Sequence, residues 1–252
     1  MKTRPDVAIS KMAKLHTHKT LLKSLAAITA LMLLLALAAC SRAEPAPVPG
    51  TPLITASEAV SLSRVATAGL RSFSFELTHD SGHTTLSGAI ELTRASGLVA
   101  TNGLDLEAEA NIGRAFVRVE AVVIGEQTWM TNPLTGVWSE IAPEDSPFAF
   151  LDPVKLVADI LGDTQQATYL ADSSSNGNVM IEGQIPAESL AALVGTVDPN
   201  ALPTVLLTVD ATSHLLKKIV LSGIVQPEDE IDTIRVITFL EFNKQTLLEP
   251  PI

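Results

Sequence analysis

Residues 104–123 read LDLEAEANIGRAFVRVEAVV, and two runs of alternation within them decide the fold. Apolar residues occupy the even positions from 104 to 110 and the odd positions from 115 to 123. A period of two is typical of a β-strand that buries one face and exposes the other. The stretch therefore predicts two strands, each with an apolar face that belongs to the core.

Strand patterns extend outward from this stretch in both directions along the chain. They predict further strands near 73–78, 84–93, 127–131, 137–141, 168–172, 179–184, 204–210, 217–222 and 232–242. Turn signals separate neighbouring strands, and Asn176-Gly177 supplies the positive φ that a tight hairpin needs. Strands joined by hairpins favour one large antiparallel sheet.

Three segments have the apolar spacing of a helix instead. They cover residues 55–70, 152–161 and 187–194. Thr55 or Ser57 caps the first helix, and Asp152-Pro153 is a cap followed by a favoured first helical residue. Because these helices are few, they must cover one face of the sheet, so we predict a single α+β domain over residues 53–252.

The predicted inner face of the central strands carries unusually small side chains. They are Ala108, Ala110, Ala115, Val117, Val119 and Ala121. Small residues beneath a helix layer have two interpretations at this point. The helices approach the sheet closely and form a tight core, or a hydrophobic cavity lies between the two layers.

Composition and charge exclude several function classes. The chain has 252 residues, of which 46% are hydrophobic and 4% aromatic. Residues 40–252 contain 11 basic and 27 acidic side chains, a net charge of −16, which repels phosphate backbones and argues against nucleic-acid binding. A single cysteine excludes an intrachain disulfide and a multi-cysteine metal site.

The N-terminus is typical of a secretory signal. A basic run over 11–23 precedes fifteen uncharged residues, 25–39. As a helix these would span about 22 Å, which is short for a membrane crossing. Leu37-Ala-Ala-Cys40 matches a bacterial lipobox, so we predict a lipoprotein signal peptide over 1–39 and acylation of Cys40. The alternative is an uncleaved anchor helix with an incidental cysteine.

Acylation would hold the mature protein on the outer side of the bacterial cell membrane or in its envelope. Buried acyl chains give stable anchoring when two or more are present. Residues 40–52 then form a linker with four prolines. In polyproline II conformation, residues 41–52 would extend up to roughly 40 Å from the bilayer.

The chain from the lipobox to about residue 250 resembles the LppX/LprA/LprF/LprG family of bacterial lipoproteins. The likeness lies in the order and pattern of several segments rather than in a catalytic motif. They are LRSFSFEL at 70–77, TWMT at 128–131 with GVWS at 136–139, FLDP at 150–153, IEGQIPAE at 181–188 and LEFNK at 240–244.

The resemblance implies a curved antiparallel half-barrel closed by helices around an apolar cavity, similar to the lipoprotein carriers of the Lol system. Such proteins bind acylated lipids or glycolipids and carry them towards the outer layer of the envelope. The resemblance implies an acylated lipid or glycolipid as partner. From the sequence we also expect attachment to the membrane through acylated Cys40, a monomer, and no cofactor. The predicted cavity lining is Leu106, Ala108, Ala110, Ala115, Val117, Val119, Ala121, Val157, Leu161, Val205, Leu207 and Val209.

Enzyme interpretations find little support in the sequence. The mature chain contains none of the phosphate-binding, serine-hydrolase or HExxH motifs. His79 and His83 flank a turn and are more consistent with a polar turn than with a metal site. Trp129 and Trp138 on adjacent strands could stack on a sugar, but cross-strand packing is the simpler interpretation. We therefore expect a non-enzymatic lipid-binding protein, with a cavity-free protein-docking module as the alternative.

Overall fold

The computed structural model describes residues 54–86, 90–170 and 177–252. The predicted signal peptide, Cys40 and the linker lie outside these residues, as does most of the predicted turn before Gly177. Residues 54–252 form one compact unit with its own hydrophobic core. No helix of the described residues is long and apolar enough to cross a membrane.

Antiparallel strands of the described chain build one twelve-stranded sheet. The strands are β1 (Phe73–Ser81), β2 (Thr84–Leu86), β3 (Ile90–Ala100), β4 (Gly103–Ile112), β5 (Ala115–Ile124), β6 (Gln127–Thr131), β7 (Trp138–Ile141), β8 (Gln165–Tyr169), β9 (Asn178–Gln184), β10 (Thr204–Asp210), β11 (Leu216–Ser222) and β12 (Ile234–Leu240). Their order across the sheet is β7-β6-β5-β4-β3-β1-β12-β11-β10-β9-β8, with β2 paired to β3. The sheet is open, because β7 and β8 form its two edges.

The last strand, β12, joins the two halves of the sheet. It pairs with β1 on one side and β11 on the other, so strands from opposite ends of the chain lie side by side. Phe75 is paired with Phe239 in this register, and the rings of Phe73 and Phe239 meet edge to face with centroids 5.8 Å apart. This non-local pairing fixes the position of the N-terminal half relative to the C-terminal half.

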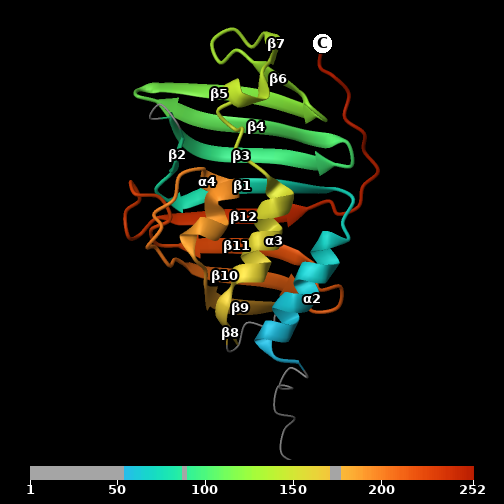
Figure 1. The fold of residues 1–252 in the computed structure, drawn as a ribbon, viewed down its shortest axis with the longest axis vertical. Coiled ribbons are helices and arrows are strands. Elements are labelled where there is room, and N and C mark those ends of the chain that lie inside the picture. Colours follow the sequence, from blue (N-terminus) through green and yellow to red (C-terminus); the bar gives the residue numbers. More distant parts are fainter. Residues whose placement is uncertain (1–53, 87–89, 171–176) are drawn as a thin grey trace, which may run out of the picture. The chain divides into compact units, whose positions relative to one another are not determined.

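Helices cover one part of one face of the sheet. The α-helices are α2 (Ala56–Ala68), α3 (Pro153–Asp163) and α4 (Ala191–Val194), and short 3₁₀ turns are η1 (Pro143–Asp145) and η2 (Ala187–Leu190). In Figure 1 they lie across β1 and β9–β12, whereas the segment that follows β7 runs in front of β5, β4 and β3 towards α3. The two halves of the sheet therefore have different covers.

Both long helices begin as their sequences predict. Thr55 and Glu58 form a capping box, in which Thr55 Oγ1 accepts from the Glu58 amide at 3.2 Å and Glu58 Oε2 accepts from the Thr55 amide at 2.7 Å. Asp152 caps α3 by accepting a hydrogen bond from the Lys155 amide at 2.9 Å, and Pro153 occupies the first turn. The start of α3 is thereby fixed where the segment from β7 reaches it.

Several predicted boundaries were wrong, although the fold class is confirmed. The strand predicted at 84–93 is two strands, β2 and β3, and β3 continues to Ala100. The helix predicted at 152–161 is α3, which continues through Gly162 to Asp163. The helix predicted at 187–194 begins as the 3₁₀ turn η2 and becomes α-helical only at Ala191.

Candidate functional site

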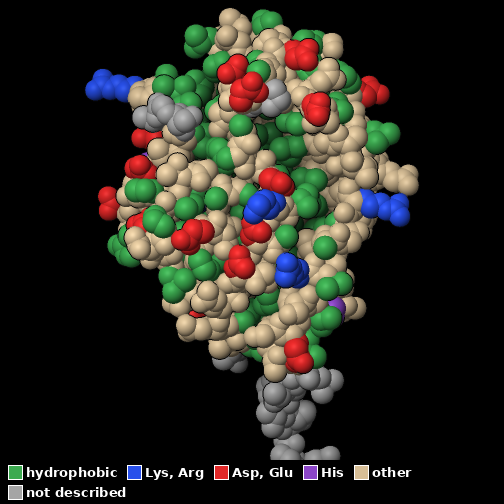
Figure 2. Space-filling model, in the orientation of Figure 1, with side chains coloured by type: hydrophobic (Ala, Val, Ile, Leu, Met, Phe, Trp, Pro, Cys, Tyr) green, Lys and Arg blue, Asp and Glu red, His purple; other side chains and the backbone are tan. Residues whose placement is uncertain are grey.

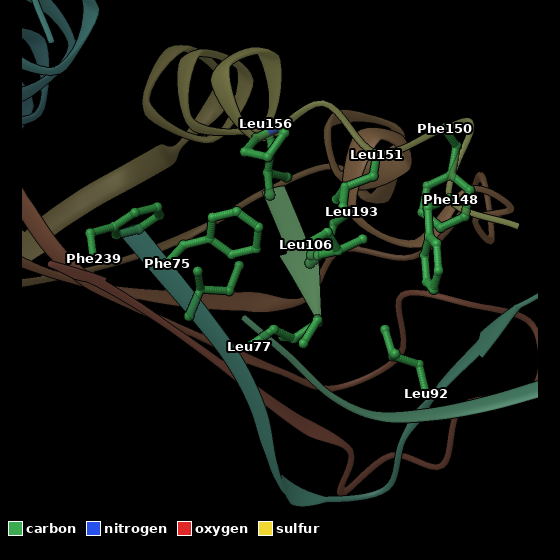
Figure 3. A pocket seen from close by; sticks show the side chains of 13 residues that line it. Phe75, Leu77, Leu92, Leu106, Phe148, Phe150, Leu151, Leu156, Leu193 and Phe239 are labelled. Carbon is green, nitrogen blue, oxygen red and sulfur yellow. The ribbon is translucent and has the colours of Figure 1, made fainter. Parts of the chain in front are cut away.

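An apolar pocket lies between the sheet and the segments that cover it (Figure 3). Every described side chain that lines it is apolar. From the strands come Phe75, Leu77, Leu92, Ala95, Leu106, Ile237 and Phe239, and from the cover come Phe148, Phe150, Leu151, Pro153, Leu156 and Leu193. These side chains nearly fill the pocket, and the water-accessible cavity volume that remains is only about 20 Å³.

The segment Ala142–Asp152, which we call the strap, forms much of this cover. Its backbone hydrogen bonds are local, and they include Ala149 N to Ser146 O at 3.1 Å and Leu151 N to Phe148 O at 2.9 Å. Among the described residues, one backbone hydrogen bond joins the strap to the helical cover. In it the amide of Asp152 donates to the carbonyl oxygen of Ala192 at 3.3 Å. The strap is therefore held over the sheet mainly by its apolar side chains.

A second hollow, the outer groove, adjoins the apolar pocket and is open to solvent. Strands β3–β6, the turn between β5 and β6, the strap and the first residues of α3 line it. The lining residues are Val99, Ala100, Gly103, Leu104, Leu106, Ala121, Val123, Gly125, Thr128, Glu144, Ser146, Phe148, Ala149, Leu151, Asp152, Pro153 and Val154. The water-accessible volume of the groove is about 730 Å³, compared with about 20 Å³ for the apolar pocket. Figure 2 shows hydrophobic side chains in a hollow in the upper half of this face.

The pocket and the groove share one wall. Leu106, Phe148, Leu151 and Pro153 line both of them. Phe148 and Leu151 belong to the strap, and Leu106 belongs to the sheet beneath it. A movement of the strap away from Leu106 would join the closed pocket to the open groove as one apolar channel.

Among the residues that the structure describes, the charged side chains at this site line the outer groove and not the apolar pocket. Glu144 and Asp152, both exposed, are the charged side chains among the described residues that line the groove. Thr128 and Ser146 supply hydroxyl groups. Within the described part of the chain, no lysine or arginine lines the pocket or the groove. The hollow is therefore apolar inside and acidic at its mouth.

The structure brings together only some of the residues predicted to line a cavity. Leu106 lines both hollows, and Ala121 lines the outer groove. Ala108, Ala110 and Val117 are buried outside both hollows. Val119 is half-buried, and Ala115 is exposed beside the turn that joins β4 and β5.

The remaining predicted residues belong to the packed core. The members of this group are Val157, Leu161, Val205, Leu207 and Val209. The helices approach the β9–β12 half of the sheet closely there, and the side chains between the two layers are almost fully buried. The tight-core interpretation thus describes this half, and the open space lies under the strap.

Sequence reasoning missed the aromatic residues that line the apolar pocket. Phe75 and Phe239 come from β1 and β12, and their proximity depends on a pairing between the ends of the chain. Phe148 and Phe150 lie in the strap, outside any periodic element. Their signal in the sequence is the apolar run Phe148-Ala-Phe-Leu151 immediately before the cap of α3.

Three polar side chains that could serve a metal or a reaction, those of His79, Glu107 and Glu109, have structural partners. His79 contacts Thr93 O through Nδ1 and Thr84 Oγ1 through Nε2, each at 3.0 Å, and burial lowers the pKa of its imidazole. Glu107 and Glu109 both form salt bridges with Arg118. No group of three or more metal-ligating side chains occurs among the described residues.

The two tryptophans lie on the opposite face from Ala121. The register pairs Ala121 with Met130 and Val122 with Trp129, so Trp129 points away from the outer groove. Trp138 is paired with Thr131 and lies on the same face of the sheet as Trp129. The side chain of Trp129 is only 4% exposed. Neither ring lines the two hollows described above.

Comparison with known proteins identifies the family. A sequence profile of the LppX/LprAFG lipoproteins matches residues 48–236, about three quarters of the chain. The chain belongs to the LppX/LprAFG lipoprotein family. No curated protein sequence matches the chain significantly. The family assignment therefore rests on the profile and on the fold.

Solved structures of two mycobacterial lipoproteins have the same fold as this family member. LprF from Mycobacterium bovis is 16% identical, with a TM-score of 0.58, and the match covers 78% of this chain and 96% of that one. LppX from Mycobacterium tuberculosis is 17% identical, with a TM-score of 0.53, over 77% of this chain and 98% of that one. The large open curved antiparallel sheet is common to these proteins.

Proposed function

We propose that this lipoprotein binds an acylated lipid or glycolipid, whose chains occupy the apolar channel between the sheet and the strap. The observation that carries this proposal is the wall shared by Leu106, Phe148 and Leu151. On one side of it lies a pocket whose described lining is apolar throughout, and on the other lies a groove open to solvent. Acyl chains would be held there by burial of apolar surface.

Loading would require the strap to move. The apolar pocket has room for little more than one water molecule while Phe148 and Leu151 are in place. Because the strap's backbone hydrogen bonds are mostly internal, it can shift without breaking the ladder of the sheet. When an acyl chain enters, the strap would exchange its apolar contacts with Leu106 for equivalent apolar contacts with the lipid.

Cys40 would carry the anchor that holds this domain outside the cytoplasmic membrane. The linker over 40–52 would let the groove reach a lipid surface while the domain stays tethered. The protein would then bind, and carry, a lipid without chemical change.

The test fills the groove at one position and compares a matched control. Ala121→Trp places a large ring in the outer groove, whereas Ala115→Trp makes the same substitution on the same strand at an exposed site. We expect Ala121→Trp to retain much less lipid after incubation with phosphatidylcholine vesicles containing diacylglycerol, and Ala115→Trp to retain the wild-type amount. Equal retention by all three folded proteins would contradict binding in this groove.

Thermal melting of the lipid-free proteins separates this result from a folding defect. A side chain that enters open space leaves the melting temperature near that of the wild type. A side chain forced into a packed core destabilises by about 1–3 kcal/mol. Lost lipid without lost stability is therefore the expected outcome for Ala121→Trp.

A further inference from the structure

We infer that the channel selects lipids whose headgroups carry no net negative charge, such as glycerides or uncharged glycolipids. This inference rests on the proposed function and names the class of lipid that the same site would accept. It is carried by the juxtaposition of an apolar interior with a rim whose charged side chains are both carboxylates, Glu144 and Asp152.

The two carboxylates lie near opposite ends of the strap. Asp152 is fixed, because its side chain caps α3 through the Lys155 amide. Glu144 lies in η1, at the start of the strap. A headgroup at the mouth of the groove would therefore meet negative charge on the element that encloses the acyl chains.

The nearest basic residue along the strap and α3 offsets only part of this charge, because the pKa of Lys155 is raised mainly by Asp159 and less by Asp152. Lys155 follows Asp152 by one turn, but its ammonium group forms an ion pair with Asp159 on the next turn. Lys155 does not line the groove. A phosphate at the mouth would thus face Glu144 and Asp152 without a basic side chain of the groove wall to pair with.

Uncharged headgroups meet a different environment at the same mouth. Ser146 and Thr128 line the groove with hydroxyl groups, which donate hydrogen bonds to ester carbonyls or sugar oxygens. Like charges at close range are unfavourable, and moving an anion from water towards an apolar channel adds a desolvation cost. Both effects favour the uncharged lipid over the anionic one.

Two lipids with identical acyl chains test this inference. Dipalmitoylglycerol and dipalmitoylphosphatidylglycerol are mixed in equal amounts in phosphatidylcholine vesicles, and the compact domain, residues 53–252, is incubated with them. Lipid retained by the re-isolated protein is counted by mass spectrometry at low and at high salt. We expect dipalmitoylglycerol in an excess on the order of fivefold at low salt, shrinking at high salt because screening weakens charge repulsion.

Charge variants separate repulsion from headgroup size. Glu144→Lys is expected to abolish or reverse the preference, and Asp152→Asn to weaken it, because asparagine keeps the helix cap while removing the charge. Glu182→Lys makes the same change on an exposed residue of β9, outside the groove, and is expected to keep the wild-type preference.

The outcomes distinguish this inference from the proposed function. Equal or greater retention of dipalmitoylphosphatidylglycerol by the wild type overturns the inference but leaves lipid binding intact. A preference that neither salt nor Glu144→Lys changes also overturns it, because headgroup size would then be the cause. Retention of neither lipid, and of no phosphatidylcholine from the vesicles, overturns the proposed function itself.

Discussion

The ring of Phe75 lies directly against the backbone of its register partner, Gly97. A Cβ atom at position 97 would lie 2.8 Å from ring atoms of Phe75 and 2.5 Å from the carbonyl oxygen of Asp105. Both distances are too short for real side chains. Because Gly97 has no side chain, the ring of Phe75 packs directly on β3. Phe75 lines the apolar pocket, so this contact fixes one wall of the pocket.

Gly97→Ala is therefore expected to destabilise the domain by about 1–3 kcal/mol, as overpacking does in other cores. Urea unfolding followed by fluorescence measures the change. Gly69→Ala is the matched control, since a Cβ there makes only ordinary contacts, the nearest at 3.5 Å, and its effect should stay within about 0.5 kcal/mol. Equal effects of the two substitutions would show that Gly97 has no special packing role.

A buried ion pair anchors the loop between β11 and β12. The guanidinium of Arg235 donates to both carboxylate oxygens of Asp229 at 2.7 Å, and both side chains are almost fully buried. Desolvation raises the pKa of Asp229, but hydrogen bonds from Arg235 and from the amides of Gln226 and Val225 outweigh it and lower the pKa overall. Removing one partner would leave the other charge buried alone.

Asp229→Ala should cost about 3–5 kcal/mol of unfolding free energy, because Arg235 would lose its partner. The exposed pair of Arg94 and Glu76 provides the comparison. Arg94→Ala is expected to change stability by less than about 1 kcal/mol. Denaturant midpoints of the two variants measure the difference, and a small effect for Asp229→Ala would mean that the loop is held by other contacts.

His79 should make the stability of the domain depend on pH. Burial, assisted by the charge of Arg235, lowers the pKa of His79 below its ordinary 6.5. The unfolded chain therefore takes up a proton at a higher pH than the folded chain does, so stability is fully present above pH 6.5 and falls as the pH drops below it.

Melting temperatures measured from pH 7.5 to pH 5 test this dependence. One group contributes at most about 1.4 kcal/mol per pH unit. His79→Gln should flatten the decline, whereas His214→Asn, in the turn between β10 and β11, should keep the wild-type slope. The account of His79 fails if both variants decline in parallel with the wild type.

Cys40→Ala tests the predicted anchor. The variant should lose incorporation of radiolabelled palmitate and should no longer partition into detergent, because the chain has no other cysteine to acylate. Cells expressing the wild type and the variant are labelled in parallel. Unchanged palmitate incorporation in the variant would contradict acylation at Cys40.

Alternation along the chain was sufficient to predict most of the fold. The even positions of β4 and the odd positions of β5 share the inner face, as the register of Leu106 with Ala121 shows. The caps at Thr55 and Asp152 were readable because each is a local hydrogen-bonding pattern. Local signals of this kind do not depend on distant parts of the chain.

The position of the open space could not be predicted in the same way. It depends on β12 pairing with β1 and on a strap without periodicity, and neither leaves a local pattern. Val205 and Leu207 have the predicted parity, yet they lie in the tightly packed core beneath the helices. The alternation of residues along a strand identifies which side chains share a face of the sheet. Whether a part of that face is packed core or open cavity depends on the helix or strap that lies over it.

Native mass spectrometry of residues 53–252, purified from a bacterial host without detergent, tests lipid binding most directly. The account predicts protein carrying an additional non-covalent mass, which organic extraction removes and identifies as an acylated lipid. Delipidated protein should regain such a mass from diacylglycerol-containing vesicles. Folded protein at its bare mass, with no lipid in the extract and none taken up from vesicles, would contradict the account and favour a protein-docking role.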